Sequence, residues 1–482
     1  MSFIGRLSLF MLSGIVATMV GFFQLRLTTR VLGPDDYGAY AIVTSVVLIG
    51  TSLNAIGVGY ILAAQFPPAT QDDRRGMVST LLLAGLAATV AFDIVVIGAW
   101  RSMGLVWRQL ETIPLGAIYL GALGLLLSYP WVVAAEVLTL ERRAGHFAAI
   151  TIAQSLVSAA VVLMGIFLLK WRTMALFAGS CAGAGVAGIG AVVALRSYLT
   201  PRVERRWLRE IGTVGIVSTI GNFGERFYTT AESYVISSGI GLVAMGLFSH
   251  ARQYRNGLMM GIAGFKRTIW PTTLSEARDL QGKFKKTDEA WAVIQLGLTV
   301  AGLLAVSFAE QVIGWLTNGK FVAASPLVVM WILVLLLQSS GPRAFGTVYA
   351  FNDGAAVSVL GIAGMGFGLI VLLLLAPRYG VMAAMGAMYL QHLVLRVGVQ
   401  FRARRFRRDG FGDALPLAGT IIVAGAYAFP LLVELSPVGK LVLPVVMLAS
   451  TFVVFRRPAG ALLRHSLALL GRSSRRALSV RD

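Results

Sequence analysis

The sequence has a single cysteine, and only 13% of its residues are charged. Cys181 lies within an apolar run and has no second cysteine with which to form an internal disulfide, so redox chemistry is not indicated. No Walker A sequence is present, and no Cys/His cluster has the spacing of metal ligands. These absences argue against a metal site, against ATP hydrolysis by this chain and against a catalytic centre. The low charge argues against an ordinary soluble protein, because soluble chains carry roughly 25% charged residues.

The chain is instead rich in long apolar segments. Of its 482 residues 57% are apolar, and the mean hydropathy is +0.77. Runs of about 20 apolar residues recur from end to end, which is the length that crosses a hydrocarbon core of ~30 Å. The sequence therefore predicts an all-α polytopic membrane protein with about fourteen transmembrane helices. They cover residues 8–28, 39–63, 77–99, 115–138, 147–168, 174–195, 211–237, 242–263, 290–309, 325–349, 355–375, 381–400, 414–433 and 439–455.

The basic residues are distributed unevenly between the two sides of this map. If both termini are cytoplasmic, the inner segments hold 28 Lys and Arg residues and the outer loops hold 8. Such an excess predicts a multi-pass protein with both termini in the cytoplasm. It also accounts for the net charge of +20 without a nucleic-acid partner. The outer loops do not exceed about 15 residues, so no extracytoplasmic domain is expected. The basic inner loops 196–210 and 264–289 are expected to contact anionic membrane lipids, and the tail after Phe455 is either an interfacial amphipathic helix or disordered.

An internal repeat links the two halves of the chain. Residues 31–40 align with residues 239–248 at an offset of 208, with glycines at matched positions. Both are outer turns after an odd-numbered span, so the repeats run parallel and predict a transporter with a central cavity between two six-helix lobes. The alternative is coincidence among glycines. The predicted domains are an N-terminal lobe at 1–210, a C-terminal lobe at 211–410, and two additional helices with a basic cytoplasmic tail at 411–482.

The hairpin at 211–260 carries more charge than a membrane span tolerates. Five polar residues recur at steps of four and three, which places them on one helix face; they are Ser218, Asn222, Glu225, Thr229 and Glu232. On the second helix Arg252 and Arg255 share a face. Charge inside a bilayer costs several kcal/mol per residue unless it is paired or hydrated. This face is therefore predicted to line a polar cavity, with Glu225 level with Arg255.

The turn Leu32-Gly33-Pro34-Asp35-Asp36-Tyr37-Gly38-Ala39-Tyr40, the helix after it as far as Gly59, and the matching Met245-Gly246-Leu247-Phe248 resemble the signatures of bacterial polysaccharide-biosynthesis flippases. Trp270-Pro271 and residues 313–324 are similar as well. These flippases belong to the multidrug/oligosaccharidyl-lipid/polysaccharide exporter superfamily. The resemblance covers roughly residues 1–400. It departs from the family pattern at Glu232, where members often carry Asp.

The resemblance implies a protein of the bacterial inner membrane that is not an enzyme. It would be a flippase that moves undecaprenyl-pyrophosphate-linked oligosaccharide repeat units from the inner to the outer leaflet by alternating access. The glycan would be a lipopolysaccharide O-antigen or an exopolysaccharide. Polysaccharide polymerase and co-polymerase proteins would be its partners. No cofactor is implied, and transport would be coupled to H⁺, to Na⁺ or to the membrane potential.

A cationic cavity is the predicted binding site. Guanidinium groups match phosphate oxygens in pairs and stay charged, so the predicted pyrophosphate ligands are Arg26, Arg226, Arg252, Arg255 and Arg343. The competing interpretation is that Glu225 and Glu232 neutralise two of the arginines as structural ion pairs, and that Arg26 extends toward the outer interface.

Other polar residues in the spans have two interpretations each. Asp93 and Glu232 are candidates for a coupling-ion site, and Asp93 could equally be a capped core carboxylate. His250 is either a titrating group or a satisfied hydrogen-bonding residue. The remaining predicted cavity liners are Gln24, Asn54 and Asn222. Residues 183–188 fit a dinucleotide-binding pattern, but they lie in a predicted span, where glycines instead favour close helix packing.

Two rival functions remain at this point. A drug/cation antiporter of the same superfamily should have acidic residues in the first span, and this chain has none there. A membrane glycan polymerase or ligase should have a large outer loop to bind sugar, and the predicted topology has none.

Overall fold

The computed structural model describes residues 3–54, 57–279, 284–351, 353–407 and 414–432, with a few positions between 446 and 451. All regular elements in these ranges are helical. In chain order they are α1 (Phe3–Thr28), α2 (Pro34–Asn54), α3 (Val58–Gln65), α4 (Gln71–Val106), η1 (Arg108–Thr112), α5 (Leu115–Leu140), α6 (Ala144–Phe167), α7 (Thr173–Leu195), α8 (Arg205–Glu210), η2 (Ile211–Gly215), α9 (Ile216–Gly239), α10 (Leu242–Arg278), α11 (Lys285–Thr317), η3 (Val322–Ala324), α12 (Ser325–Gln338), α13 (Pro342–Ala350), α14 (Gly354–Tyr379), α15 (Val381–Ala403) and α16 (Ala414–Leu432).

The first thirteen predicted spans each coincide with one of these helices or with a broken pair of them. Seven single helices in the described part are long and apolar enough to cross a membrane, and one bent pair qualifies as an eighth. The number fourteen therefore stays a prediction. The last predicted span, 439–455, and the basic tail lie largely outside the described residues.

Two predicted spans are interrupted. The span at 39–63 consists of α2 and α3, and Gly57 before α3 has a φ of +66°, which favours glycine. A Cβ at Gly57 would lie 2.3 Å from the Cα of Gly215, so the backbones also approach closely there. The span at 325–349 bends by 43° between α12 and α13. Gly341 lies at this bend with a φ of +82°, followed by Pro342 at the first position of α13, where proline is well tolerated.

The predicted inner loop at 264–289 is mostly helix, which corrects the sequence-based boundaries. α10 continues to Arg278, and α11 begins at Lys285. Arg407 accounts for the end of α10, because its guanidinium donates to the carbonyl oxygens of Glu276 and Asp279 at 3.0 and 2.8 Å. A basic side chain that binds the last carbonyls stabilises a helix C-terminus.

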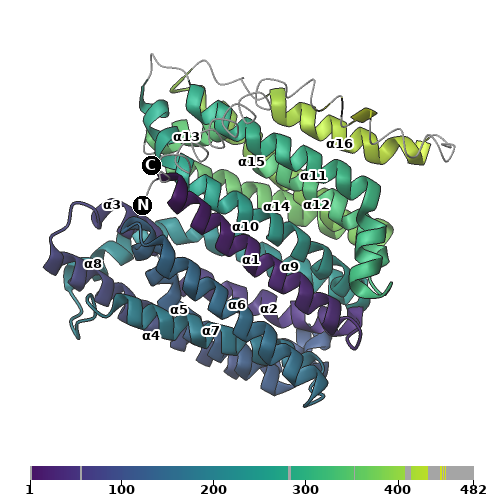
Figure 1. Cartoon of the computed structure of the whole chain (residues 1–482), viewed down its shortest axis with the longest axis horizontal. Coiled ribbons are helices and arrows are strands. Elements are labelled where there is room, and N and C mark those ends of the chain that lie inside the picture. The colour runs from purple at the N-terminus through teal and green to yellow at the C-terminus, as the bar shows by residue number, and fades with distance from the viewer. Residues whose placement is uncertain are drawn as a thin grey trace, which may run out of the picture. The chain divides into compact units, whose positions relative to one another are not determined.

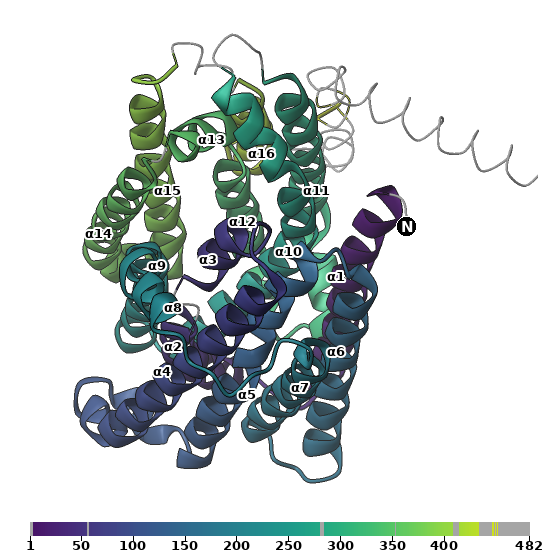
Figure 2. The same ribbon diagram turned by 90° about the vertical axis from the view of Figure 1, so that its left-hand side faces the viewer.

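The chain forms two compact units whose boundaries differ from those of the predicted lobes. Unit 1 contains residues 1–265, 310–324 and 358–391, and unit 2 contains residues 266–309, 325–357 and 392–482. The lobe boundaries remain a prediction. In unit 1, α4, α5, α6 and α7 run side by side (Figures 1 and 2). α1 packs on α6, and α2 packs on α9.

Glycines bring α7 close to its neighbours, as the sequence predicts for residues 183–188. A Cβ at Gly188 would lie 2.3 Å from the carbonyl oxygen of Leu127 in α5, and one at Gly183 would lie 3.0 Å from the Cβ of Ser158 in α6. The helices can approach this closely only without side chains at these positions. The packing interpretation of this segment is confirmed.

Gly188→Ala should therefore lower stability by about 1–3 kcal/mol, because a backbone oxygen cannot move aside for the new methyl group. The measurement is denaturant unfolding of the purified protein in detergent. Gly185→Ala is the matched control on the same helix, since a Cβ there meets its nearest atom at an ordinary 3.7 Å. Equal stability of the two variants would contradict the packing role of Gly188.

The two repeated turns contact each other reciprocally within unit 1. A Cβ at Gly38 would lie 2.2 Å from the carbonyl oxygen of Leu242, and a Cβ at Gly246 would lie 1.7 Å from that of Pro34. Leu242 and Gly246 are the counterparts of Pro34 and Gly38 at the repeat offset of 208. A two-fold relation between the turns would produce this symmetry. We call this contact the glycine crossing; it holds the start of α2 against the start of α10.

Further hydrogen bonds hold the helices together at the same end of unit 1. Trp107 Nε1 donates to Ser237 Oγ at 2.9 Å, and Gln109 Nε2 donates to the Ser237 carbonyl at 3.0 Å, so the segment at η1 is attached to the end of α9. Lys320 Nζ donates to the carbonyl of Arg30 at 3.0 Å. The predicted topology makes this the outer end, and there the first and second halves of the sequence are joined.

In unit 2, the turn between α13 and α14 is held by a side-chain hydrogen bond from α15. Asp353 accepts a hydrogen bond from Arg402 Nε in α15. The guanidinium lowers the pKa of the Asp353 carboxyl group. Asp353, which directly precedes α14, is thereby held to the last turn of α15.

Candidate functional site

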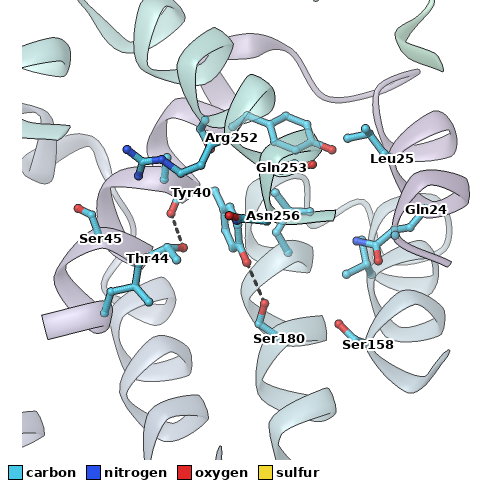
Figure 3. A pocket seen from close by; sticks show the side chains of 17 residues that line it. Gln24, Leu25, Tyr40, Thr44, Ser45, Ser158, Ser180, Arg252, Gln253 and Asn256 are labelled. Atoms are coloured by element: carbon cyan, nitrogen blue, oxygen red, sulfur yellow. Dashed lines mark hydrogen bonds between the residues drawn. The ribbon is translucent and has the colours of Figure 1, made fainter. Parts of the chain in front are cut away.

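A cavity of about 400 Å³ lies inside unit 1, between helices of both halves of the sequence (Figure 3). We call it the polar cavity. Its described lining comes from α1, α2, α6, α7 and α10, and comprises Gly21, Gln24, Leu25, Tyr37, Tyr40, Ala41, Thr44, Ser45, Leu48, Ser158, Val162, Leu176, Ser180, Ser249, Arg252, Gln253 and Asn256. On α2 and α10 these positions recur at steps of three and four, as on one face of a helix.

Hydroxyl groups dominate the wall formed by α2 and α7. The hydroxyls of Tyr40 and Ser180 lie 3.0 Å apart, and Thr44 Oγ1 donates to the Tyr40 carbonyl at 2.8 Å (Figure 3). Ser45 Oγ donates to the Ile42 carbonyl at 2.7 Å. The Tyr40 ring packs on Phe177 with centroids 5.0 Å apart, which fixes its position on the wall. This side of the cavity is therefore polar and uncharged.

Arg252 is the charged residue among the described lining. Its guanidinium donates to Glu232 of α9, whose side chain is fully buried, and lies 4.7 Å above the ring of Phe248. The structure thus pairs Glu232 with an arginine of the second helix of the predicted hairpin. This ion pair corresponds to the competing, structural interpretation of Arg252. Whether either residue also binds substrate or a coupling ion stays a prediction.

Arg255 lies beside the cavity. Its Nη1 donates to Asn256 Oδ1 at 3.3 Å, and Asn256 lines the wall. Arg226, Arg252, Glu225 and Glu232 lie near enough to Arg255 to interact with it electrostatically. The predicted level of Glu225 and Arg255 stays a prediction. The side chain of Asn222, predicted on the same face, lies outside the description, as does that of Asn54.

Two predicted phosphate ligands have other contacts. Arg26 Nη1 donates to the Trp315 carbonyl at 2.6 Å, and its guanidinium carbon lies 3.7 Å from the centroid of the Trp315 ring. Arg343 belongs to unit 2, where its Nε donates to Asp288 Oδ1 at 2.6 Å and its Nη2 to Oδ2. Such paired contacts are the strong form of an arginine–carboxylate interaction. The role of Arg343 as a phosphate ligand stays a prediction.

The remaining candidates differ in burial. His250 is fully buried, stacks on Phe321 with centroids 4.3 Å apart, and has Nε2 3.2 Å from the Tyr254 hydroxyl, as a hydrogen-bonded core residue would. Gln24 lines the cavity. Asp93 is partly exposed on α4 next to Ile94, which is 66% exposed. Among the described residues, no group of His, Cys, Asp and Glu is arranged to hold a metal ion.

Sequence reasoning missed most of the cavity wall, because it searched for charge. Ser249 and Gln253 precede Arg252 and Asn256 at helical spacing, so the face of α10 could have been extended to include them. On α2 the polar positions Tyr37, Tyr40 and Thr44 show the same spacing. Ser158 and Ser180 carry no comparable signal, since single serines are common in membrane helices.

Comparison with known proteins gives a consistent result. A family model described as polysaccharide biosynthesis protein matches residues 27–326. None of the curated proteins compared matches the sequence. Among solved structures, the fold is similar to the lipid II flippase MurJ in an inward closed conformation, with a TM-score of 0.68 at 9% identity, over 95% of this chain and 99% of that one.

Two transporter structures are also similar. An inward-facing multidrug resistance MATE family transporter of the MOP superfamily gives a TM-score of 0.60 at 14% identity, with 87% of this chain and 95% of that chain covered. The eukaryotic MATE transporter AtDTX14 gives 0.60 at 9% identity, with 87% and 98% covered. At these identities the likeness shows a shared fold. The apolar helices and this fold together identify a multi-pass membrane protein.

Proposed function

The chain belongs to the polysaccharide biosynthesis protein family, and from this premise we propose that it flips undecaprenyl-pyrophosphate-linked oligosaccharide repeat units from the inner to the outer leaflet of the bacterial inner membrane. The polar cavity within a membrane fold is the observation that supports the proposal most. Polar groups inside a bilayer are energetically costly, so those that are present generally mark a transport pathway or a binding site. The substrate's polar headgroup would occupy this region while the polyprenyl chain stays in lipid.

The pyrophosphate is proposed to bind at Arg226 and Arg255. Arg255 reaches the cavity wall through Asn256, and Arg226 acts electrostatically on Arg255. Two adjacent guanidinium groups repel each other and are favoured when an anion lies between them. Arg252 is less suited to this task, because a phosphate would have to compete with the buried carboxylate of Glu232.

Alternating access is the proposed transport mechanism. The glycine crossing and the contacts of Trp107, Gln109 and Lys320 close the predicted outer end of unit 1, and release of the headgroup outward requires that they separate. The membrane potential contributes ~2.3 kcal/mol per charge per 100 mV, and it favours outward movement of an anion. Alternatively, transport is driven by coupling to H⁺ or Na⁺ through Asp93 or Glu232. Polysaccharide polymerase and co-polymerase proteins are the proposed partners.

The rival function, a drug/cation antiporter, is supported by the likeness to MATE transporters. A site for an organic cation should present negative charge. The charged residue among the described lining of the polar cavity is instead Arg252. The charges therefore favour an anionic or neutral headgroup over a cation.

Cells that lack this gene should accumulate lipid-linked repeat units in the inner leaflet, because synthesis continues while translocation stops. The measurement is the fraction of these lipids that an externally added glycosidase can cleave in spheroplasts, compared with cells that carry the gene. The flippase proposal is wrong if the fraction is the same in both strains.

Replacing both proposed phosphate ligands, Arg226→Gln with Arg255→Gln, should reduce translocation in the same assay by about 100-fold or more. Charge-assisted hydrogen bonds contribute about 1.5–3 kcal/mol each. Arg378→Gln, at the end of α14, is the matched control. Unaltered translocation by a double variant present at wild-type levels in the membrane would exclude these two ligands.

A further inference from the structure

The lining of the polar cavity is close to electrically neutral. Arg252 is the charged side chain among its described residues, and the carboxylate of Glu232 accepts its hydrogen bond. An ionised pyrophosphate in this cavity would bring at least two negative charges to a site whose cation is already paired. Burial of uncompensated charge costs several kcal/mol. The cavity is therefore poorly suited to phosphate.

The hydroxyl groups point to the same conclusion by their hydrogen-bond direction. Thr44 and Ser45 donate their protons to carbonyl oxygens of α2, so toward the cavity they offer acceptor lone pairs. A phosphate oxygen is an acceptor as well and gains nothing from such a group. A sugar hydroxyl can donate to it. The wall of α2 thus matches a ligand with O–H donors.

The opposite walls supply the complementary groups. Gln24 on α1 and Gln253 and Asn256 on α10 have amide side chains, each with donors and an acceptor. Figure 3 shows these amides and the Tyr40–Ser180 pair around one space. Tyr40 combines an apolar ring with a polar hydroxyl, which suits the C–H and O–H groups of a pyranose. A volume of about 400 Å³ lies within the ~300–1,000 Å³ range of small-molecule sites.

We propose that the polar cavity is a subsite for an uncharged sugar residue of the lipid-linked glycan, with the pyrophosphate outside it at Arg255. This inference rests on the proposed flippase function. The hydrogen bond between Arg255 and Asn256 indicates how the ligand is oriented. Asn256 belongs to the wall that contacts the sugar, and Arg255 lies beside the cavity, where it contacts the pyrophosphate. The sugar is recognised by neutral hydrogen bonds, and the phosphate by charge.

Binding of three synthetic probes to the full-length protein in detergent tests this subsite. The first is a short-chain prenyl pyrophosphate that carries one N-acetylhexosamine, the second carries no sugar, and the third carries a uronic acid. The variants are Ser180→Ala and Thr44→Val. Ser128→Ala and Thr89→Val are matched controls, because these hydroxyls bond to their own helix and are not among the described cavity lining.

The N-acetylhexosamine probe should bind the wild type most tightly. Each cavity variant should weaken it about three- to tenfold, the loss expected for one hydrogen bond, while the probe without sugar changes less than about twofold. The controls should leave all affinities unchanged, and the uronic acid probe should bind about tenfold more weakly or worse.

Three results would overturn the proposal in different ways. Equal loss of the sugar and sugar-free probes would place the sugar elsewhere. Equal or tighter binding of the uronic acid probe would show that the subsite is not selective for neutral sugars. If no probe binds the wild type, the flippase function itself fails and the subsite with it.

Discussion

Gly246→Ala is expected to hold the predicted outer end open and to reduce translocation about tenfold or more. A methyl group at this position would lie 1.7 Å from the carbonyl oxygen of Pro34, so α2 and α10 have to separate. Overpacking of this kind costs typically 1–3 kcal/mol, and 1.4 kcal/mol shifts an equilibrium tenfold. A transporter that cannot close its outer end cannot complete a cycle of alternating access.

Cysteine labelling measures this opening directly, because the chain has one native cysteine. In a Cys181→Ser background, Ser249→Cys places a thiol on the wall of the polar cavity. A membrane-impermeant maleimide added outside intact cells should label it at least about tenfold faster in the Gly246→Ala variant. Gly239→Ala in the same hairpin is the control, since a Cβ there meets nothing within 4 Å. Identical labelling and normal translocation in both variants would refute a gating role for the glycine crossing.

Loss of the Glu232 charge should produce the largest change in stability. Glu232→Gln leaves the guanidinium of Arg252, only 17% exposed, without its carboxylate. Removal of one partner of a buried ion pair costs about 3–5 kcal/mol. The double variant Glu232→Gln with Arg252→Gln should recover most of this loss, since it removes both charges.

Denaturant unfolding in detergent distinguishes the outcomes. Asp72→Asn breaks the exposed pair of Asp72 and Arg75, whose side chains are 94% and 43% exposed, and should change stability by less than about 1 kcal/mol. If the single and double variants at 232 and 252 are equally unstable, the two charges do not stabilise each other. Retained binding of the neutral-sugar probe by the double variant would further separate sugar recognition from charge.

Hydropathy located the helices well and their ends poorly. Apolar runs coincide with helices from α1 to α16, because the cost of exposing backbone polar groups to lipid requires helical structure in these runs. The run does not specify where the helix stops. α10 continues to Arg278 through a polar segment whose end is stabilised by Arg407, far along the chain. The bend before Pro342 was readable in principle, since proline favours the start of a helix.

The candidate site was predicted in part for a similar reason. Charges in a membrane span are conspicuous, so Glu232, Arg252 and Arg255 were found from spacing alone. Their pairing depends on how α9 meets α10, and the sequence favoured a ligand site while leaving an ion pair open as the competing interpretation. The hydroxyls of Thr44 and Ser180 were missed, because such groups often bond to their own helix and carry no signal of what else they face.

The glycine crossing also has a thermodynamic consequence. Each glycine presents a Cα–H group to a carbonyl oxygen of the other turn, and such contacts contribute about 0.5–1 kcal/mol apiece. No long side chain at Gly38 or Gly246 has to be immobilised when the turns meet or released when they part. The free energies of the closed and open states can therefore lie within a few kcal/mol of each other. In that range the binding of one headgroup can make the less populated state the more populated one.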